Sequence, residues 1–246
     1  MTGAWRKAAA GLTLLAVLTG GGITGTIGYF SAREEVPNVF TVGDLDVALE
    51  EPEWEPELGD GRDLCPGYSV YKNPTIENRT EQGKGGPCYV RMRMRVLDAS
   101  GKQITQEDRL KLILTTIRYD ETFTGTIHQK GEGSLIREGR LPGYSLEEVT
   151  KLPMVNPLFV KDEMRSGAGE LVFNYLGRER DGIFRSGDQA TLFTDLVIPS
   201  GWNKEKMELM GEFTLEIRAE AIQTQGFTTM RDALTVLDDE QKGGVS

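Results

Sequence analysis

The sequence predicts an all-β fold, an antiparallel β-sandwich or jelly roll with a few short helices in loops and at the C-terminus. Two stretches, residues 89–97 and 213–223, alternate strictly between apolar and polar side chains, as half-buried strands do. Shorter alternating stretches elsewhere in the chain are separated by turns rich in Gly and Pro. Many short strands joined by such turns are typical of two packed sheets.

The first 28 residues have the order of a signal peptide. Arg6 and Lys7 form a basic start, residues 8–18 are an apolar run, and small residues follow up to Gly28. The apolar run is shorter than the roughly 20 residues that a membrane helix needs. Small residues before the bond between Gly28 and Tyr29 suit cleavage there, although glycines further upstream offer competing sites. We expect a mature chain that begins at Tyr29 and works outside the cytoplasm.

No internal repeat and no low-complexity linker divides the rest of the chain. We therefore expect a cleaved signal peptide over residues 1–28, a mature N-terminal segment over residues 29–40 and a single β-sandwich domain over residues 41–246. The formal net charge is −10, and it becomes −12 once Arg6 and Lys7 are removed. An acidic surface argues against nucleic acid and anionic lipid as partners. No stable membrane anchor is expected after cleavage.

Alternation and turn residues mark the expected elements of the domain. Strands are expected over residues 40–49, 68–78, 89–97, 171–176, 189–198 and 213–223, with a hairpin between residues 110–119 and 123–129. Pro74 would place part of the second strand at a sheet edge. Helices are expected over residues 106–112, from Ser145 onward, and over residues 230–240 with Thr228 or Thr229 as the N-cap.

Two cysteines, Cys65 and Cys88, remain in the mature chain. An even count in an exported protein indicates a disulfide. Such a bond stabilises a fold by roughly 3 kcal/mol in the chain-entropy model. Two free thiols are the alternative, and we expect the disulfide.

The strand at residues 89–97 presents Arg91, Arg93 and Arg95 on one face. These arginines could bind an anionic partner such as a wall polymer. The other interpretation is pairing with acidic residues of a neighbouring strand, for instance Glu216 and Glu220. Because the chain is strongly acidic, we expect the pairing.

Three stretches of the chain carry a resemblance to one family. They are GGITGTIGYFSAREEVPNVFTVGDLDVAL from residue 21; PGYSVYKNPTIENRT followed by CYVRMRMRV; and LFTDLVIPSGWN followed by GEFTLEIRAEAIQTQGF. Together they resemble the TasA and camelysin family of secreted Gram-positive proteins. The signal peptide is similar to the type cut by a dedicated, SipW-like signal peptidase. The resemblance covers most of the mature chain and is weakest over residues 99–169.

The resemblance implies a secreted structural subunit, a jelly-roll sandwich that assembles head to tail into extracellular fibres of a biofilm matrix. The mature N-terminal segment, residues 29–40, would be a donor strand that completes the sheet of the next subunit. The residues that would enter the neighbour are Tyr29, Phe30, Val36, Val39 and Phe40. Pro37 and the charges at residues 33–35 fit a long strand poorly, and a disordered mature terminus is the alternative. The implied partners are further copies of the chain, a SipW-like signal peptidase, and other matrix proteins or wall polymers.

Camelysin-like proteins have been called metallopeptidases, so an enzyme is one alternative. The chain has a single histidine, His128, and lacks the His-Glu-x-x-His motif of zinc peptidases. We therefore expect no catalytic residue, no metal site and no cofactor. A second alternative is a monomeric adhesin on the same sandwich, which would bind wall or host polymers.

Overall fold

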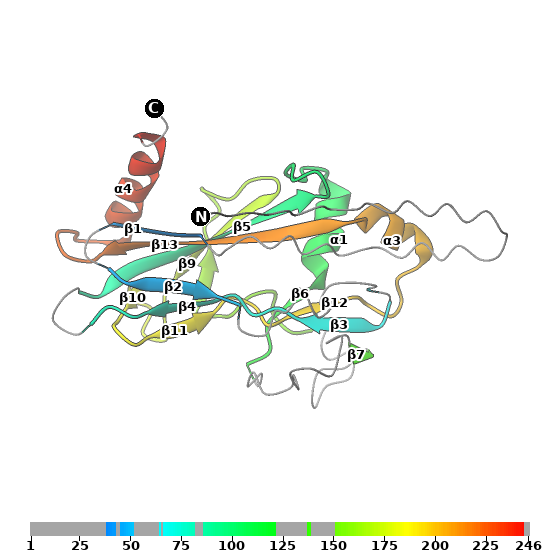
Figure 1. The fold of residues 1–246 in the computed structure, drawn as a ribbon, viewed down its shortest axis with the longest axis horizontal. Coiled ribbons are helices and arrows are strands. Elements are labelled where there is room, and N and C mark those ends of the chain that lie inside the picture. The colour runs from blue at the N-terminus through cyan, green and yellow to red at the C-terminus, as the bar shows by residue number, and fades with distance from the viewer. Residues whose placement is uncertain are drawn as a thin grey trace, which may run out of the picture.

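The protein is described by a computed structural model that covers residues 38–42, 45–51, 64, 66–81, 86–121, 137–138 and 151–243. The expected signal peptide, the expected strand at residues 123–129 and the expected helix at Ser145 lie outside these residues. Figure 1 shows the described strands in two layers, with α4 at one end and α1 and α3 at the other.

The first layer is a six-stranded sheet in the order β1-β13-β5-β9-β8, with β10 paired to β5. Its strands are β1 (Asn38–Val42), β13 (Phe213–Gln223), β5 (Cys88–Asp98), β9 (Glu170–Tyr175), β8 (Phe159–Lys161) and β10 (Ile183–Phe184). Every pair in this sheet is antiparallel except β1 with β13, which is parallel. The two long central strands, β5 and β13, are the two with strict alternation in the sequence.

The second layer consists of two smaller antiparallel sheets. One contains β11 (Gln189–Thr191), β4 (Thr75–Asn78) and β2 (Val47–Glu50) in that order. The other contains β6 (Ile117–Arg118), β12 (Asp195–Val197), β3 (Tyr68–Tyr71) and β7 (Arg137–Glu138).

The hydrophobic core lies between the two layers. Alternate residues of β5 and β13 meet apolar residues of the second layer in one cluster, which includes Val90, Met92, Met94, Ile217, Ala219 and Ala221 on one side and Val47, Ile76, Ala190 and Leu196 on the other. Met92 and Ile76 are both completely buried. The mostly antiparallel, sandwich-like β fold expected from the sequence is therefore confirmed.

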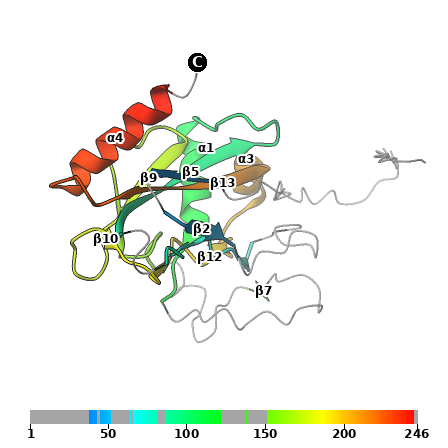
Figure 2. The same ribbon diagram turned by 60° about the vertical axis from the view of Figure 1, so that its left-hand side comes forward.

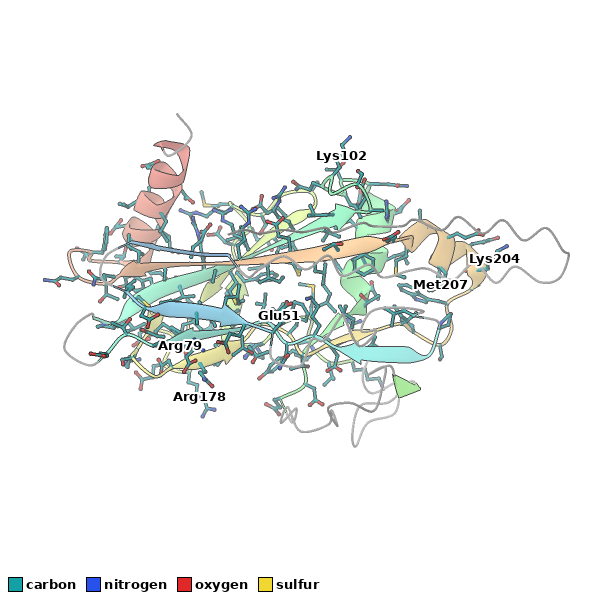
Figure 3. The ribbon with its side chains drawn as sticks, in the orientation of Figure 1. Glu51, Arg79, Lys102, Arg178, Lys204 and Met207 are labelled. Atoms are coloured by element: carbon teal, nitrogen blue, oxygen red, sulfur yellow. The ribbon has the colours of Figure 1, made fainter. Side chains whose placement is uncertain are left out.

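Three short helices lie outside the sheets in the described part of the chain: α1 (Glu107–Thr116), α3 (Lys204–Met210) and α4 (Met230–Gly243). α4 was expected, and Thr229 caps it by accepting a hydrogen bond from the amide of Asp232 at 3.2 Å. α1 runs further than expected and leaves only Ile117–Arg118 as a strand. α3 was not expected; Figure 3 shows Lys204 pointing outward from it and Met207 inward.

Three predicted strands are each divided in two. Residues 40–49 are split between β1 and β2, residues 68–78 between β3 and β4, and residues 189–198 between β11 and β12. In each case the two parts belong to different sheets. The divisions arise because the chain passes between sheets inside one apolar stretch, which alternation alone does not reveal.

None of the helices in the described residues is both long enough and apolar enough to span a membrane.

Candidate functional site

The N-terminal strand β1 forms one edge of the six-stranded sheet. It runs parallel to β13, with Asn38 opposite Arg218 and Val42 opposite Ile222. β13 comes from the other end of the chain, so no short turn connects the two strands. Figure 2, seen from another side, also places β1 beside β13. The link between the two strands is therefore backbone pairing between distant parts of one chain.

β13 has two halves that differ along the edge shared with β1. Residues 218–222, the occupied half, pair with β1. Residues 213–217, the open half, pair with β5 on their other side, and no described strand pairs with their outer edge. An unpaired sheet edge presents backbone N–H and C=O groups that another strand can use. The outer edge of β13 can therefore pair with a longer strand than β1, the strand that the described residues supply.

The structure places part of the predicted donor segment in β1. Val39 lies opposite Ala219, and Phe40 lies opposite Glu220. The strand begins directly after Pro37, which has no N–H to donate to a ladder, and it continues past Phe40 to Val42. Tyr29, Phe30, Val36 and the expected cleavage site between Gly28 and Tyr29 lie outside the described residues.

Only residues 43–46 connect β1 to β2, and these strands belong to different layers. The end of the connection nearest β2 is fixed, because the amide of Asp46 donates to Thr80 Oγ1 at 2.9 Å and its carbonyl accepts from the amide of Arg79 at 2.7 Å. Asp46 therefore anchors the start of β2 to the two residues that follow β4.

The predicted pairing of Arg91, Arg93 and Arg95 with acidic residues of a neighbouring strand is confirmed on the outer face of the sheet. Arg93 Nε donates to Glu220 at 2.7 Å, and Arg95 Nη1 lies 3.3 Å from Glu216. Arg91 donates to the same Glu220. At this end of the face the Arg91 side chain is completely buried and that of Glu220 is 3% exposed. The reason is α4, which lies over this end of the face and adds Asp238 at 2.7 Å from Arg91.

Cys88 is a free, buried thiol at the start of β5. Its Sγ donates to the carbonyl of Phe184 at 3.5 Å and lies 3.6 Å from Asn78 Nδ2, which donates to it. Burial, helped by the charge of Asp188, raises the pKa of the thiol to about 12. Cys65 lies outside the described residues, so the disulfide expected between Cys65 and Cys88 stays a prediction.

Among the described residues, no group of three or more His, Cys, Asp or Glu side chains is placed to hold a metal ion. His128, the single histidine on which a zinc peptidase would depend, lies outside them.

Comparison with other proteins returned no similarity on which a family can be based. The chain matches no protein-family model, and neither a curated protein nor a solved structure is significantly similar to it. The function is therefore argued from the sheet edge at β1 and from the sequence.

Proposed function

We propose that the chain is a secreted structural subunit that polymerises into extracellular fibres of a biofilm matrix. Its fold would be a jelly roll of the TasA and camelysin kind. After removal of the signal peptide, each subunit would donate its N-terminal strand to the sheet of the next. A SipW-like signal peptidase would release the mature terminus.

The position of β1 is the observation that supports this proposal. Among the described strands, β1 is the last at its edge. It lies near the start of the chain and is attached to the rest of the sandwich through a connection of four residues. A strand from a second copy can make the same backbone pairs with β13. Exchange of identical elements costs little, because the backbone pairs that break within one subunit form again between two subunits.

The same position is compatible with an open filament. Each subunit has one strand to give and one β13 edge to receive it, and these are different surfaces. A contact between different surfaces continues from subunit to subunit unless the rotation happens to close a ring. Cleavage before Tyr29 would serve as the trigger, since a free N-terminus can reach a neighbour.

Electron microscopy of three purified chains tests the proposal. The chain that begins at Tyr29 should form regular filaments. The chain that begins at Gly43 lacks β1 and should not. Thr41→Pro in the Tyr29 chain should also prevent filaments, because proline in mid-strand removes a backbone donor, whereas Thr41→Ser serves as the matched control and should assemble.

Filaments from the Gly43 chain would contradict strand donation, because that chain has no strand to give. If none of the chains assembles at any concentration, the adhesin hypothesis takes its place, and binding of wall polymers to the monomer becomes the property to measure.

A further inference from the structure

The N-terminal strand and the C-terminal helix meet on the same half of β13. β1 pairs with residues 218–222 along the edge. α4 covers the outer face at the same place, where Ile222 and Tyr89 pack against Ala233, Leu234 and Leu237. Figure 1 shows α4 above the end of the sheet where β1 and β13 lie together. The occupied half of β13 is therefore held along its edge and on its face by elements from opposite ends of the chain.

An ionic network ties α4 to this half. Asp238 of α4 accepts from Arg91 Nη1 at 2.7 Å and from Arg93 Nη2 at 3.4 Å. The same two arginines bond Glu220, which lies opposite Phe40 of β1 in the strand register. Asp238 also accepts from Arg165 Nε at 2.7 Å. Through Arg91 and Arg93, the carboxylate of Asp238 thus links Glu220, which lies opposite β1 in the register, to the loop after β8.

Arg91 is the buried member of this network. Its side chain is completely buried, and Arg91 Nη2 has no hydrogen-bond partner in the described part of the molecule. Its Nη1 also donates to the carbonyl of Leu234 in α4 at 3.4 Å. A buried charge that loses one partner is strongly disfavoured. Undocking of α4 would take Asp238 and the Leu234 carbonyl away from Arg91, and it would uncover the face of β13 behind β1.

We propose that α4 is a latch that controls the exchange of β1, an inference that rests on the proposed function. With α4 docked, residues 218–222 are held in place and β1 stays paired. With α4 undocked, that half of β13 becomes mobile and β1 leaves more easily. Because coupling between two sites is reciprocal, loss of β1 also weakens the docking of α4.

Hydrogen exchange of the dissolved monomer tests the latch without reference to filaments. Asp238→Asn removes the charge that α4 contributes and keeps the shape of the side chain. It is compared with Asp239→Asn, the same change at the next, exposed position. Both are made in the full chain and in the chain that begins at Tyr29. In D238N, exchange of the amides of residues 38–42 should rise by roughly 5- to 150-fold, the usual range for coupled sites. In D239N it should match wild type.

Leu234→Ala is a second route to the same state, because it loosens α4 through packing and leaves every charge in place. It should accelerate the exchange of residues 38–42 in the same direction. The reciprocal experiment uses the chain that begins at Gly43, in which the amides of α4 should exchange faster than in the chain that begins at Tyr29. Circular dichroism establishes that each variant is folded.

The outcomes separate the latch from the proposed function. Unchanged exchange at residues 38–42 in both D238N and L234A overturns the latch, even if the wild-type chain forms filaments. Faster exchange in these variants supports the latch, even if no filament is ever seen, and the failure then belongs to the proposed function alone. When filaments form, D238N should assemble faster than D239N.

Discussion

The two edges of the six-stranded sheet are held in different ways. β8, at one edge, is antiparallel to β9 and is joined to it by a short connection in the same chain segment. β1, at the other edge, is parallel to β13, which lies at the far end of the chain. The partner of β8 is close in sequence, whereas the partner of β1 lies at the far end of the chain. Under the proposed function, β1 is therefore the strand that can leave without opening a hairpin.

Side chains reinforce this difference. Asp162, directly after β8, accepts from the amides of Met164 and Arg165 at 3.1 Å, from Arg165 Nη1 at 2.9 Å and from Asn174 Nδ2 of β9 at 3.0 Å. Phe159 of β8 is buried edge-on against Tyr175, with ring centroids 5.5 Å apart. The β8 edge is thus fixed by local bonds. At the β1 edge, the described structure shows backbone pairing with β13 and the packing of α4 against the face behind it.

The largest loss of stability is expected from Glu220→Gln, which breaks the network behind β1. The change takes from the buried Arg91 one of its two carboxylate partners, Glu220 and Asp238, and breaking a comparable buried pair costs about 3–5 kcal/mol. Urea unfolding of the chain measures the effect. Glu163→Gln is the matched control, because Glu163 is 75% exposed beside Lys161, and it should leave the midpoint unchanged.

A smaller loss is expected from Asp162→Ala at the β8 edge. The substitution removes an acceptor shared by two amides, one guanidinium and one side-chain amide, and we expect a cost of about 2 kcal/mol, as for hydrogen bonds to charged groups. The exchange of the β8 amides should rise, while that of residues 38–42 should stay as in wild type. If D162A accelerated amide exchange equally at β8 and at residues 38–42, the two edges would not be held in different ways.

Acid should reduce the difference in stability between wild type and D162A. Burial acts to raise the pKa of Asp162, but hydrogen bonds from Asn174 and Arg165 outweigh it and hold the pKa below its ordinary value of 3.8. A group with a depressed folded pKa stabilises the fold above its ordinary pKa and loses that effect as the pH falls through the folded value. The gap between the two urea midpoints should therefore narrow below about pH 4. A gap that stays constant down to strongly acid pH would show that the ionised carboxylate contributes nothing.

The smallest effect is expected from an alkylating reagent at Cys88, which lies in β5 between the two edges. Because burial raises the pKa of this thiol to about 12, iodoacetamide should not modify it in the native protein at neutral pH. After unfolding without reductant, mass spectrometry should find it alkylated. Alkylation that requires a reductant even after unfolding would show that Cys88 is oxidised, as expected for a disulfide with Cys65.

Much of the sheet could be predicted because its long strands are half-buried. Alternation located β5 and β13 and their inward residues. The acidic residues expected on a neighbouring strand, such as Glu216 and Glu220, predicted the pairing of the arginines of β5. The helix α4 was recognisable from its apolar period and from Thr228 or Thr229 as its cap, and the structure shows Thr229 in that role. These features depend on local patterns that one segment carries by itself.

The parts that could not be predicted depend on contacts between distant segments. Nothing local in residues 38–42 indicates a parallel partner at the other end of the chain. The burial of Arg91 follows from where α4 docks, which its own sequence does not specify. α3 has only seven residues and a largely charged sequence, so Asn203, which caps it through the amide of Lys206, and Gly211 were its main signals.

Strand exchange between subunits can be measured directly by disulfide trapping. Asn38 lies opposite Arg218 in the register of β1 and β13, and neighbouring strand positions lie within the span of a disulfide. Asn38→Cys and Arg218→Cys are made in separate chains that begin at Tyr29, and also together in one chain. The double variant should cross-link within one molecule or between molecules, which establishes the register. An equal mixture of the single variants should form a heterodimer in which Cys at position 38 of one chain is bonded to Cys at position 218 of the other. A double variant that closes only within itself, beside a mixture without this heterodimer, would contradict exchange of β1 between subunits.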